Sequence, residues 1–200
     1  MFKTYTSRVA FVELLHVLST VKLKRLPRQF RGLRACLRNR KVSLGQNSPV
    51  CLDVLVVGPG GSGSTELIKH ISKYYVCNSP TDSDGLKHLP TPPTPKLANK
   101  ILFVYRDVED IKKSLSRRGI ALFQLMKLWP PGVSLKFGDR ISFEFLIRRQ
   151  AISFENEPAI ATLFVHYKDL FESGQQISEF LGKRDGFVET FPKRRTLIFA

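Results

Sequence analysis

Eight residues, Gly58 to Thr65 (GPGGSGST), carry four glycines and three hydroxyl side chains directly after the apolar run CLDVLVV. Glycines allow a tight turn whose backbone N–H groups converge on an anion, assisted by the positive end of a following helix. The spacing is close to that of a triphosphate-binding loop, but Ser64 stands where that loop has lysine. The pattern predicts a phosphate site, and the alternative is a plain strand-to-helix turn.

A second candidate for anion binding is Arg106, which follows the apolar run KILFVY. A triphosphate-cleaving site needs a loop lysine and an acidic residue at a strand end that helps to hold Mg²⁺. Here an arginine stands at the strand end, Asp107 comes one residue later, and Asp53 lies inside the first run. We therefore predict a ligand with phosphates at two places and no obligatory metal. The alternative for Arg106 is a surface ion pair with Glu109 or Asp110.

Short apolar runs predict the strands that carry these residues, at 51–58, 100–105 and 160–167. Helical spacing or helix-end signals follow each run and predict helices over 65–75, 107–119 and 168–182. The alternation predicts an α/β fold of three layers with a central parallel sheet. Ligands in such sheets bind beyond the carboxyl ends of the strands.

Two longer segments separate these elements. Residues 76–100 hold five prolines and predict a long loop, which is usually functional or disordered. Residues 120–157 are expected to be mostly helical, with a break at Trp129–Gly132.

Charge is concentrated at the start of the chain. The 200 residues carry a net charge of +15, and residues 1–41 account for +10 of it. We predict a basic arm over residues 1–49 and one compact domain over residues 50–200. The arm could dock on an anionic polymer or a membrane surface, or it could be an organellar transit peptide. A cytoplasmic location is favoured over organelle targeting.

Neither a disulfide framework nor a membrane span is predicted. The three cysteines, Cys36, Cys51 and Cys77, show no C-x-x-C spacing, which also argues against a zinc site. The closest apolar stretch, Val9–Val21, is shorter than the ~18 residues of a membrane span and reads as an amphipathic helix.

Four segments resemble the sulfotransferases that use 3′-phosphoadenosine 5′-phosphosulfate (PAPS), over about residues 51–182. GGSGST lies over the family loop P-K-S-G-T-T, and LKHLP is similar to K-T-H-L-P. Arg106 and Ser114 keep the family's spacing of eight residues after a strand. LFVHYKDLFESGQQISEFLG is similar to the family segment that reads aromatic-Tyr-Glu-Asp and ends in Glu-Phe-Leu-Gly or a close variant. The resemblance implies a P-loop-like sulfotransferase fold.

The resemblance also implies roles in binding PAPS and its product 3′,5′-ADP. Arg106 and Ser114 would hold the 3′-phosphate, and Tyr167 would lie beside the adenine, although a core tyrosine is an equal alternative. The 5′-phosphate would be held by the loop, which comprises Gly61, Ser62, Gly63, Ser64 and Thr65.

Two residues of LKHLP are the candidate catalytic groups. The resemblance makes His88 the base that takes a proton from an acceptor hydroxyl, with an unperturbed pKa of about 6.5. The alternative is a surface histidine. The family's loop lysine corresponds to Gly61 here, and Lys87 is the nearest candidate to supply its charge. The family's C-terminal Arg-Lys-Gly clamp has no clear match.

We therefore expect an enzyme that moves a sulfuryl group from PAPS to a hydroxyl of a carbohydrate, small molecule or protein, without a metal. A catalytically degenerate nucleotide- or polyanion-binding protein of the same fold is the first alternative. A P-loop kinase-like enzyme with a displaced lysine is the second.

Overall fold

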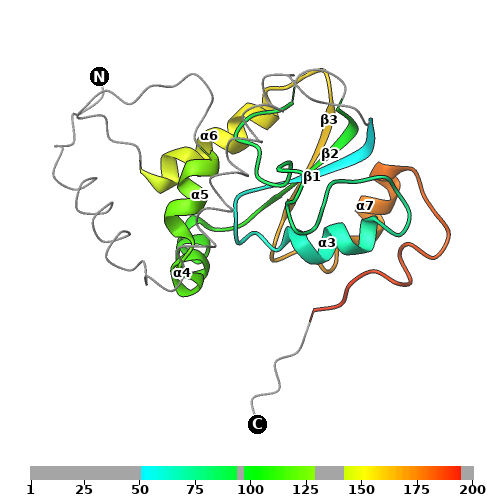
Figure 1. Ribbon diagram of the computed structural model, residues 1–200. Coiled ribbons are helices and arrows are strands. Elements are labelled where there is room, and N and C mark those ends of the chain that lie inside the picture. The colour runs from blue at the N-terminus through cyan, green and yellow to red at the C-terminus, as the bar shows by residue number, and fades with distance from the viewer. Residues whose placement is uncertain (1–50, 94–96, 129–141, 195–200) are drawn as a thin grey trace, which may run out of the picture.

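The computed structural model describes residues 51–93, 97–128 and 142–194. The basic arm predicted over residues 1–49, with its amphipathic stretch and Cys36, lies outside the described residues. The helix break predicted at Trp129–Gly132 lies outside them as well. The described part forms a mixed α/β structure (Figure 1).

A parallel sheet of three strands forms the centre, in the order β1 (Leu52–Val57), β2 (Ala98–Tyr105) and β3 (Ala161–His166). Val56 is in register with Leu102. All three predicted strands are confirmed, although β2 begins two residues earlier than expected. The valine-rich sequence of β1 (LDVLVV) suits a strand that is buried on both faces, whereas β3 (ATLFVH) lies at the edge of the sheet and is mostly half-buried.

One face of the sheet packs on α3 (Ser64–Ile71) and α7 (Gly174–Leu181). Val54 and Val56 point to this face and share a core with apolar side chains of both helices and with Phe187. The alternation of side chains along β1 therefore sends Val54 and Val56 toward these two helices and leaves Leu55 and Val57 for the other face.

The opposite face packs on α6 (Phe143–Glu155) and on the loop after α3. Leu55 and Val57 point to this face, where they share a core with Leu86, Leu89 and Phe154. The sheet is thus covered on both sides by apolar contacts. This packing holds the loop that carries Lys87 and His88 against the sheet.

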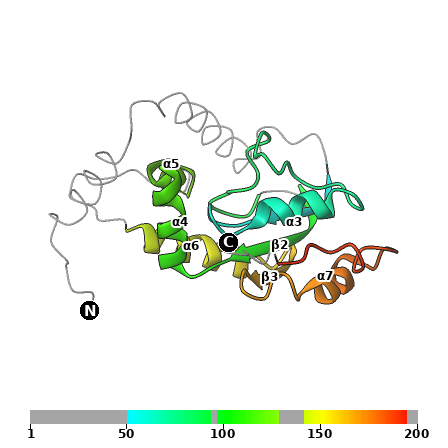
Figure 2. The ribbon, with the colours of Figure 1, turned by 90° about the horizontal axis from the view of Figure 1, so that it is seen from below.

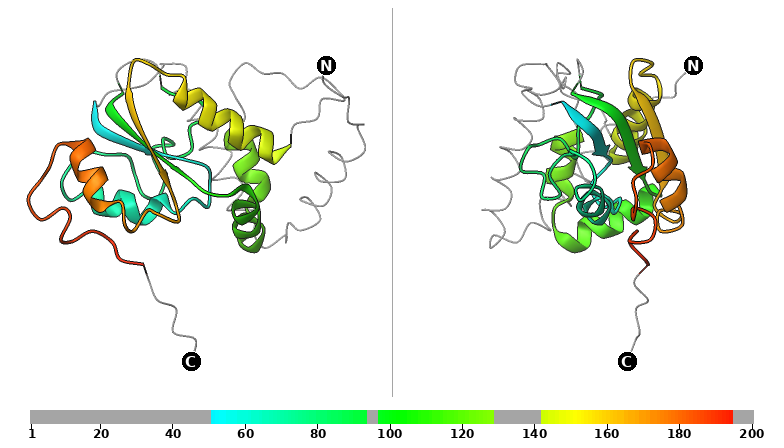
Figure 3. Two further views of the ribbon diagram at one scale, coloured as in Figure 1. Left: turned by 180° about the vertical axis from the view of Figure 1, so that it is seen from behind. Right: turned by 90° about the vertical axis from the view of Figure 1, so that its right-hand side faces the viewer.

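A third apolar cluster joins α4 (Val108–Arg118), α5 (Ala121–Leu128) and α6. Figures 2 and 3 show these three helices grouped at one end of the molecule, with α3 and α7 at the other. The predicted helix over residues 107–119 is confirmed: Asp107 precedes its first turn, and Gly119 ends it in a left-handed conformation (φ 64°).

Two predicted helices are shorter than expected. The helix predicted over residues 65–75 ends at Ile71, because the Lys73 and Tyr74 N–H groups bond three residues back and tighten the chain into a turn. The helix predicted over residues 168–182 begins only at Gly174. Turns occupy the residues before it. No helix among the described residues is long and apolar enough to cross a membrane.

The outer edge of β1 is closed by an asparagine side chain. The Val56 N–H donates to Asn78 Oδ1 at 2.8 Å, and Asn78 Nδ2 donates to the Val56 carbonyl at 2.9 Å. Two residues earlier in β1, Val54 makes an isolated parallel bridge with Cys77. The turn after α3 therefore satisfies backbone groups that a fourth strand would otherwise pair.

Candidate functional site

The glycine-rich loop joins β1 to α3 through backbone conformations and close contacts that would be strained with any residue other than glycine. Gly63 precedes the first turn of α3 with φ 85°, and a Cβ atom placed there would lie 2.3 Å from the Tyr167 ring. A Cβ atom at Gly58 would lie 2.1 Å from the Val104 carbonyl oxygen. Glycine is therefore required for the loop to lie against β2 and Tyr167.

A pocket of about 340 Å³ opens where β1, β2 and β3 end. It is lined by residues from the glycine-rich loop, from Lys87–His88, from α4 and α5, and by Arg106 and Tyr167. All the predicted site residues line it except Ser62. The sequence thus correctly predicted that distant segments meet at the carboxyl ends of the strands.

Ser62 is the exception. Its side chain is fully buried, and its Oγ has no hydrogen-bond partner among the described residues. The loop turns it away from the pocket toward Gly58, where an added Cβ atom would lie 3.0 Å from the Ser62 Oγ. Ser64 and Thr65 remain as the loop hydroxyls that line the pocket.

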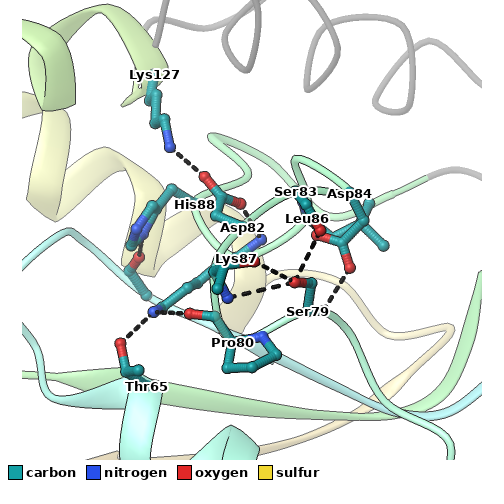
Figure 4. Close-up of polar contacts among 12 residues, drawn as sticks. Thr65, Ser79, Pro80, Asp82, Ser83, Asp84, Leu86, Lys87, His88 and Lys127 are labelled. Atoms are coloured by element: carbon teal, nitrogen blue, oxygen red, sulfur yellow. Dashed lines mark hydrogen bonds and ion pairs between the residues drawn. The ribbon is translucent and has the colours of Figure 1, made fainter. Parts of the chain in front are cut away.

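Lys87 reaches the start of α3 from the long loop. Its Nζ donates to Thr65 Oγ1 and, at 3.0 Å, to the Pro80 carbonyl (Figure 4). The residue is 7% exposed, and burial lowers the pKa of its ammonium group to about 8. The structure therefore brings this cation to the edge of the glycine-rich loop, as the sequence predicted.

A buried ion pair fixes the loop that carries Lys87. Asp82 accepts a hydrogen bond from the Lys87 backbone N–H at 3.0 Å and pairs with Lys127 of α5 (Figure 4). The side chains of the pair are 7% and 4% exposed. Asp82 adopts a positive φ of 59°, which aspartate tolerates better than most residues. Nothing in the sequence pattern predicted this pair.

His88 lies beneath the glycine-rich loop and is not a surface histidine. It is 7% exposed, and its Nδ1 lies 2.7 Å from the Gly58 carbonyl oxygen. Because a carbonyl only accepts, Nδ1 carries the proton, and Nε2 has the lone pair of the neutral ring. Burial lowers the pKa of His88 to about 4, which corrects the expectation of an unperturbed histidine.

Arg106 and Tyr167 form a stacked pair at the other side of the pocket. The guanidinium carbon lies 4.7 Å from the Tyr167 ring centroid. Arg106 Nη2 also lies 3.2 Å from Asp110 Oδ2, so the ion pair that was the alternative interpretation of Arg106 exists, with Asp110 as its partner. Both Arg106 and Tyr167 line the pocket while they make these contacts.

Three pocket side chains were not predicted: Arg117, Arg118 and Gln124. The signal for Arg118 was present, since it lies one helical turn after Ser114 and therefore on the same face of α4. No sequence signal marks Gln124, because its contact with Gly60 depends on how α5 packs on the loop.

The electrostatic character of the pocket is strongly positive. Among the described residues, four lining side chains are cations, namely Lys87, Arg106, Arg117 and Arg118, and none is a carboxylate. The described residues contain no cluster of three or more histidine, cysteine or acidic side chains that could hold a metal ion. The donors and cations together suit a small polyanion.

Comparisons of the chain with protein-family models, curated proteins and solved structures found no match. The class of the protein therefore follows from its fold and pocket: a mixed α/β protein with a three-stranded parallel sheet and a cationic pocket at the carboxyl ends of the strands.

Proposed function

We propose that this protein is a sulfotransferase of P-loop-like fold, which binds PAPS in the cationic pocket and transfers its sulfuryl group to a hydroxyl. The observation that carries the proposal is the meeting of three separate sequence segments in one pocket. These are the glycine-rich loop, the Arg106–Ser114 pair and the Lys87–His88 pair. Each segment, taken by itself, also has a plainer interpretation, so it is their meeting in one pocket that supports the proposal.

The donors of the pocket support two phosphate positions. The first is the start of α3, where the glycine-rich loop and Lys87 line the pocket and Lys87 Nζ contacts the Thr65 hydroxyl. The second lies toward α4, where Arg106 and Ser114 line the same pocket. PAPS and 3′,5′-ADP carry phosphate groups on two carbons of one ribose, which matches this division.

The lone pair of His88 suits it to proton transfer in the proposed reaction. His88 accepts the proton of the acceptor hydroxyl while the hydroxyl oxygen forms its bond to sulfur. Lys87 and the loop N–H groups stabilise the negative charge left on the phosphate oxygen when its bond to sulfur breaks. This transfer of a sulfuryl group needs neither a redox change nor a metal.

Ligand-dependent thermal unfolding of the full chain tests the nucleotide assignment. A ligand at 100 times its Kd adds about 2.7 kcal/mol of stability. We expect 3′,5′-ADP and PAPS to raise the unfolding temperature clearly more than AMP does at equal concentration. Stabilisation by Mg·ATP alone would overturn the proposal and favour a kinase-like enzyme.

A binding protein without catalysis is the second candidate, and the burial of His88 favours it. A histidine with a pKa of about 4 is a weak base. The variant His88→Asn separates the two functions: in an enzyme it abolishes sulfate transfer from PAPS and leaves 3′,5′-ADP binding within a small factor of wild type. Transfer that survives in His88→Asn would contradict the role of His88 as the base.

A further inference from the structure

Gly61 and the end of α4 meet at one corner of the pocket. A Cβ atom at Gly61 would lie 3.2 Å from Arg118 Nη2 and 3.4 Å from Ser114 Oγ. Gly61 also has φ 93°, a conformation that favours glycine. The absence of a side chain at Gly61 therefore lets the Arg118 guanidinium approach the loop backbone closely.

The Arg118 side chain is directed toward this corner by its own helix. Its Nε donates to the Ser114 carbonyl oxygen at 3.2 Å, one helical turn back. This contact leads the guanidinium along the face of α4 that carries Ser114, and Arg118 and Ser114 both line the pocket. Arg118 is exposed at the mouth of the pocket, and partial desolvation, with a smaller contribution from the neighbouring Arg117, lowers its pKa.

The glycine-rich loop contains no cation of its own between Gly58 and Thr65. Loops that bind phosphate combine backbone N–H groups with a side-chain cation, usually a lysine within the loop. Here the cations come from other elements. Lys87 contacts Thr65 at the end of the loop, and the Arg118 guanidinium lies beside Gly61 in the middle of it.

We propose that Arg118 is a phosphate-binding residue. Its guanidinium, carried by α4 and placed beside Gly61, binds a phosphate group of the nucleotide and so supplies the positive charge that the loop lacks. A guanidinium suits this position, because it offers several donors in one plane and can hold two oxygens of a phosphate. This inference rests on the proposed binding of a nucleotide that carries phosphates.

Calorimetric titration of the full chain with 3′,5′-ADP tests the assignment, with Arg118→Ala beside a matched control. Lys113→Ala is that control, since Lys113 is exposed on the same helix and does not line the pocket. A hydrogen-bonded charge pair implies that Arg118→Ala weakens binding about tenfold to hundredfold. Lys113→Ala is expected to stay within about twofold of wild type.

Two further measurements identify the guanidinium as the cause. Arg118→Lys keeps the charge without the planar fork, so we expect it to recover only part of the lost affinity. Guanidinium ion at millimolar concentration should restore binding to Arg118→Ala and leave Lys113→Ala unchanged. Equal affinity of wild type and Arg118→Ala would overturn the inference.

The outcomes also separate this inference from the proposed function. If wild type binds 3′,5′-ADP no better than AMP, the proposed function fails before any variant is compared. If wild type prefers 3′,5′-ADP but Arg118→Ala and Lys113→Ala bind it alike, the function stands and the role of Arg118 is wrong.

Discussion

Lys87 couples the charge of the pocket to pH, because burial lowers its pKa to about 8. A phosphate bound beside it favours the ammonium form and raises that pKa. Above about pH 8, binding must therefore recruit a proton, and affinity falls as pH rises, by up to about tenfold per pH unit. The affinity stops falling once the pH exceeds the pKa that Lys87 has in the complex.

Titrations of 3′,5′-ADP between about pH 7 and pH 9.5 measure this effect. Lys87→Arg is the informative variant, since a guanidinium keeps its charge throughout this range. We expect wild type to lose affinity with rising pH and Lys87→Arg to hold nearly constant. A parallel decline in both proteins would show that another group titrates.

Gly63 offers a second prediction at the scale of one residue. Gly63→Ala combines a positive φ with a Cβ atom 2.3 Å from the Tyr167 ring. Gly182→Ala is the matched control, because Gly182 has φ 98° and nothing within 4 Å of the added atom. Backbone strain alone costs about 1–2 kcal/mol, so Gly182→Ala measures that part.

Urea unfolding should show a larger loss of stability for Gly63→Ala than for Gly182→Ala. The excess reflects displacement of Tyr167, and it should be accompanied by weaker 3′,5′-ADP binding only in Gly63→Ala. Equal losses in the two variants would mean that the ring moves aside without consequence.

At the scale of elements, the ion pair between Asp82 and Lys127 joins the long loop to α5. Removing one partner of a buried pair leaves an uncompensated charge and costs about 3–5 kcal/mol. Asp82→Asn removes the charge and tolerates the positive φ at this position, so it isolates the electrostatic loss. Combining it with Lys127→Met should restore part of the stability.

Unfolding in urea measures both variants, and limited proteolysis within residues 76–93 reports whether the loop has detached. A loss below about 1 kcal/mol in Asp82→Asn would show that the pair contributes no more than an exposed one.

The helices and strands also show which features of the fold sequence patterns can predict. The strands were predictable because each centres on a short apolar run, and a run of this length favours a strand packed in a sheet. The start of α7 was not, because residues 168–173 satisfy their backbone groups in turns, as in the bond from the Glu172 N–H to the Asp169 carbonyl. Gln124 and the Asp82–Lys127 pair arise only when α5 packs on the loops, which local spacing does not encode.

At the scale of the whole molecule, burial of His88 links folding to pH. Its pKa falls from 6.5 to about 4 on folding, so between these values the unfolded chain binds a proton that the native protein does not. Stability therefore decreases as pH falls through this window. The full shift corresponds to about 3 kcal/mol at 1.36 kcal/mol per unit.

Urea midpoints recorded between about pH 7 and pH 4.5 measure the slope. We expect His88→Asn to flatten it relative to wild type. His70, whose pKa burial also lowers, adds a contribution of the same sign, so His70→Asn serves as the comparison. An unchanged slope in His88→Asn would place the acid sensitivity elsewhere.

The asparagine that closes the β1 edge has a consequence for self-association. Exposed sheet edges recruit strands from other molecules, which leads to aggregation. Along β1, the Asn78 amide already occupies both hydrogen-bonding groups of Val56, and Cys77 lies beside Val54. An incoming strand would have to displace a buried side chain before it formed its first bonds there, so this short sheet resists growth into a fibril from its β1 side.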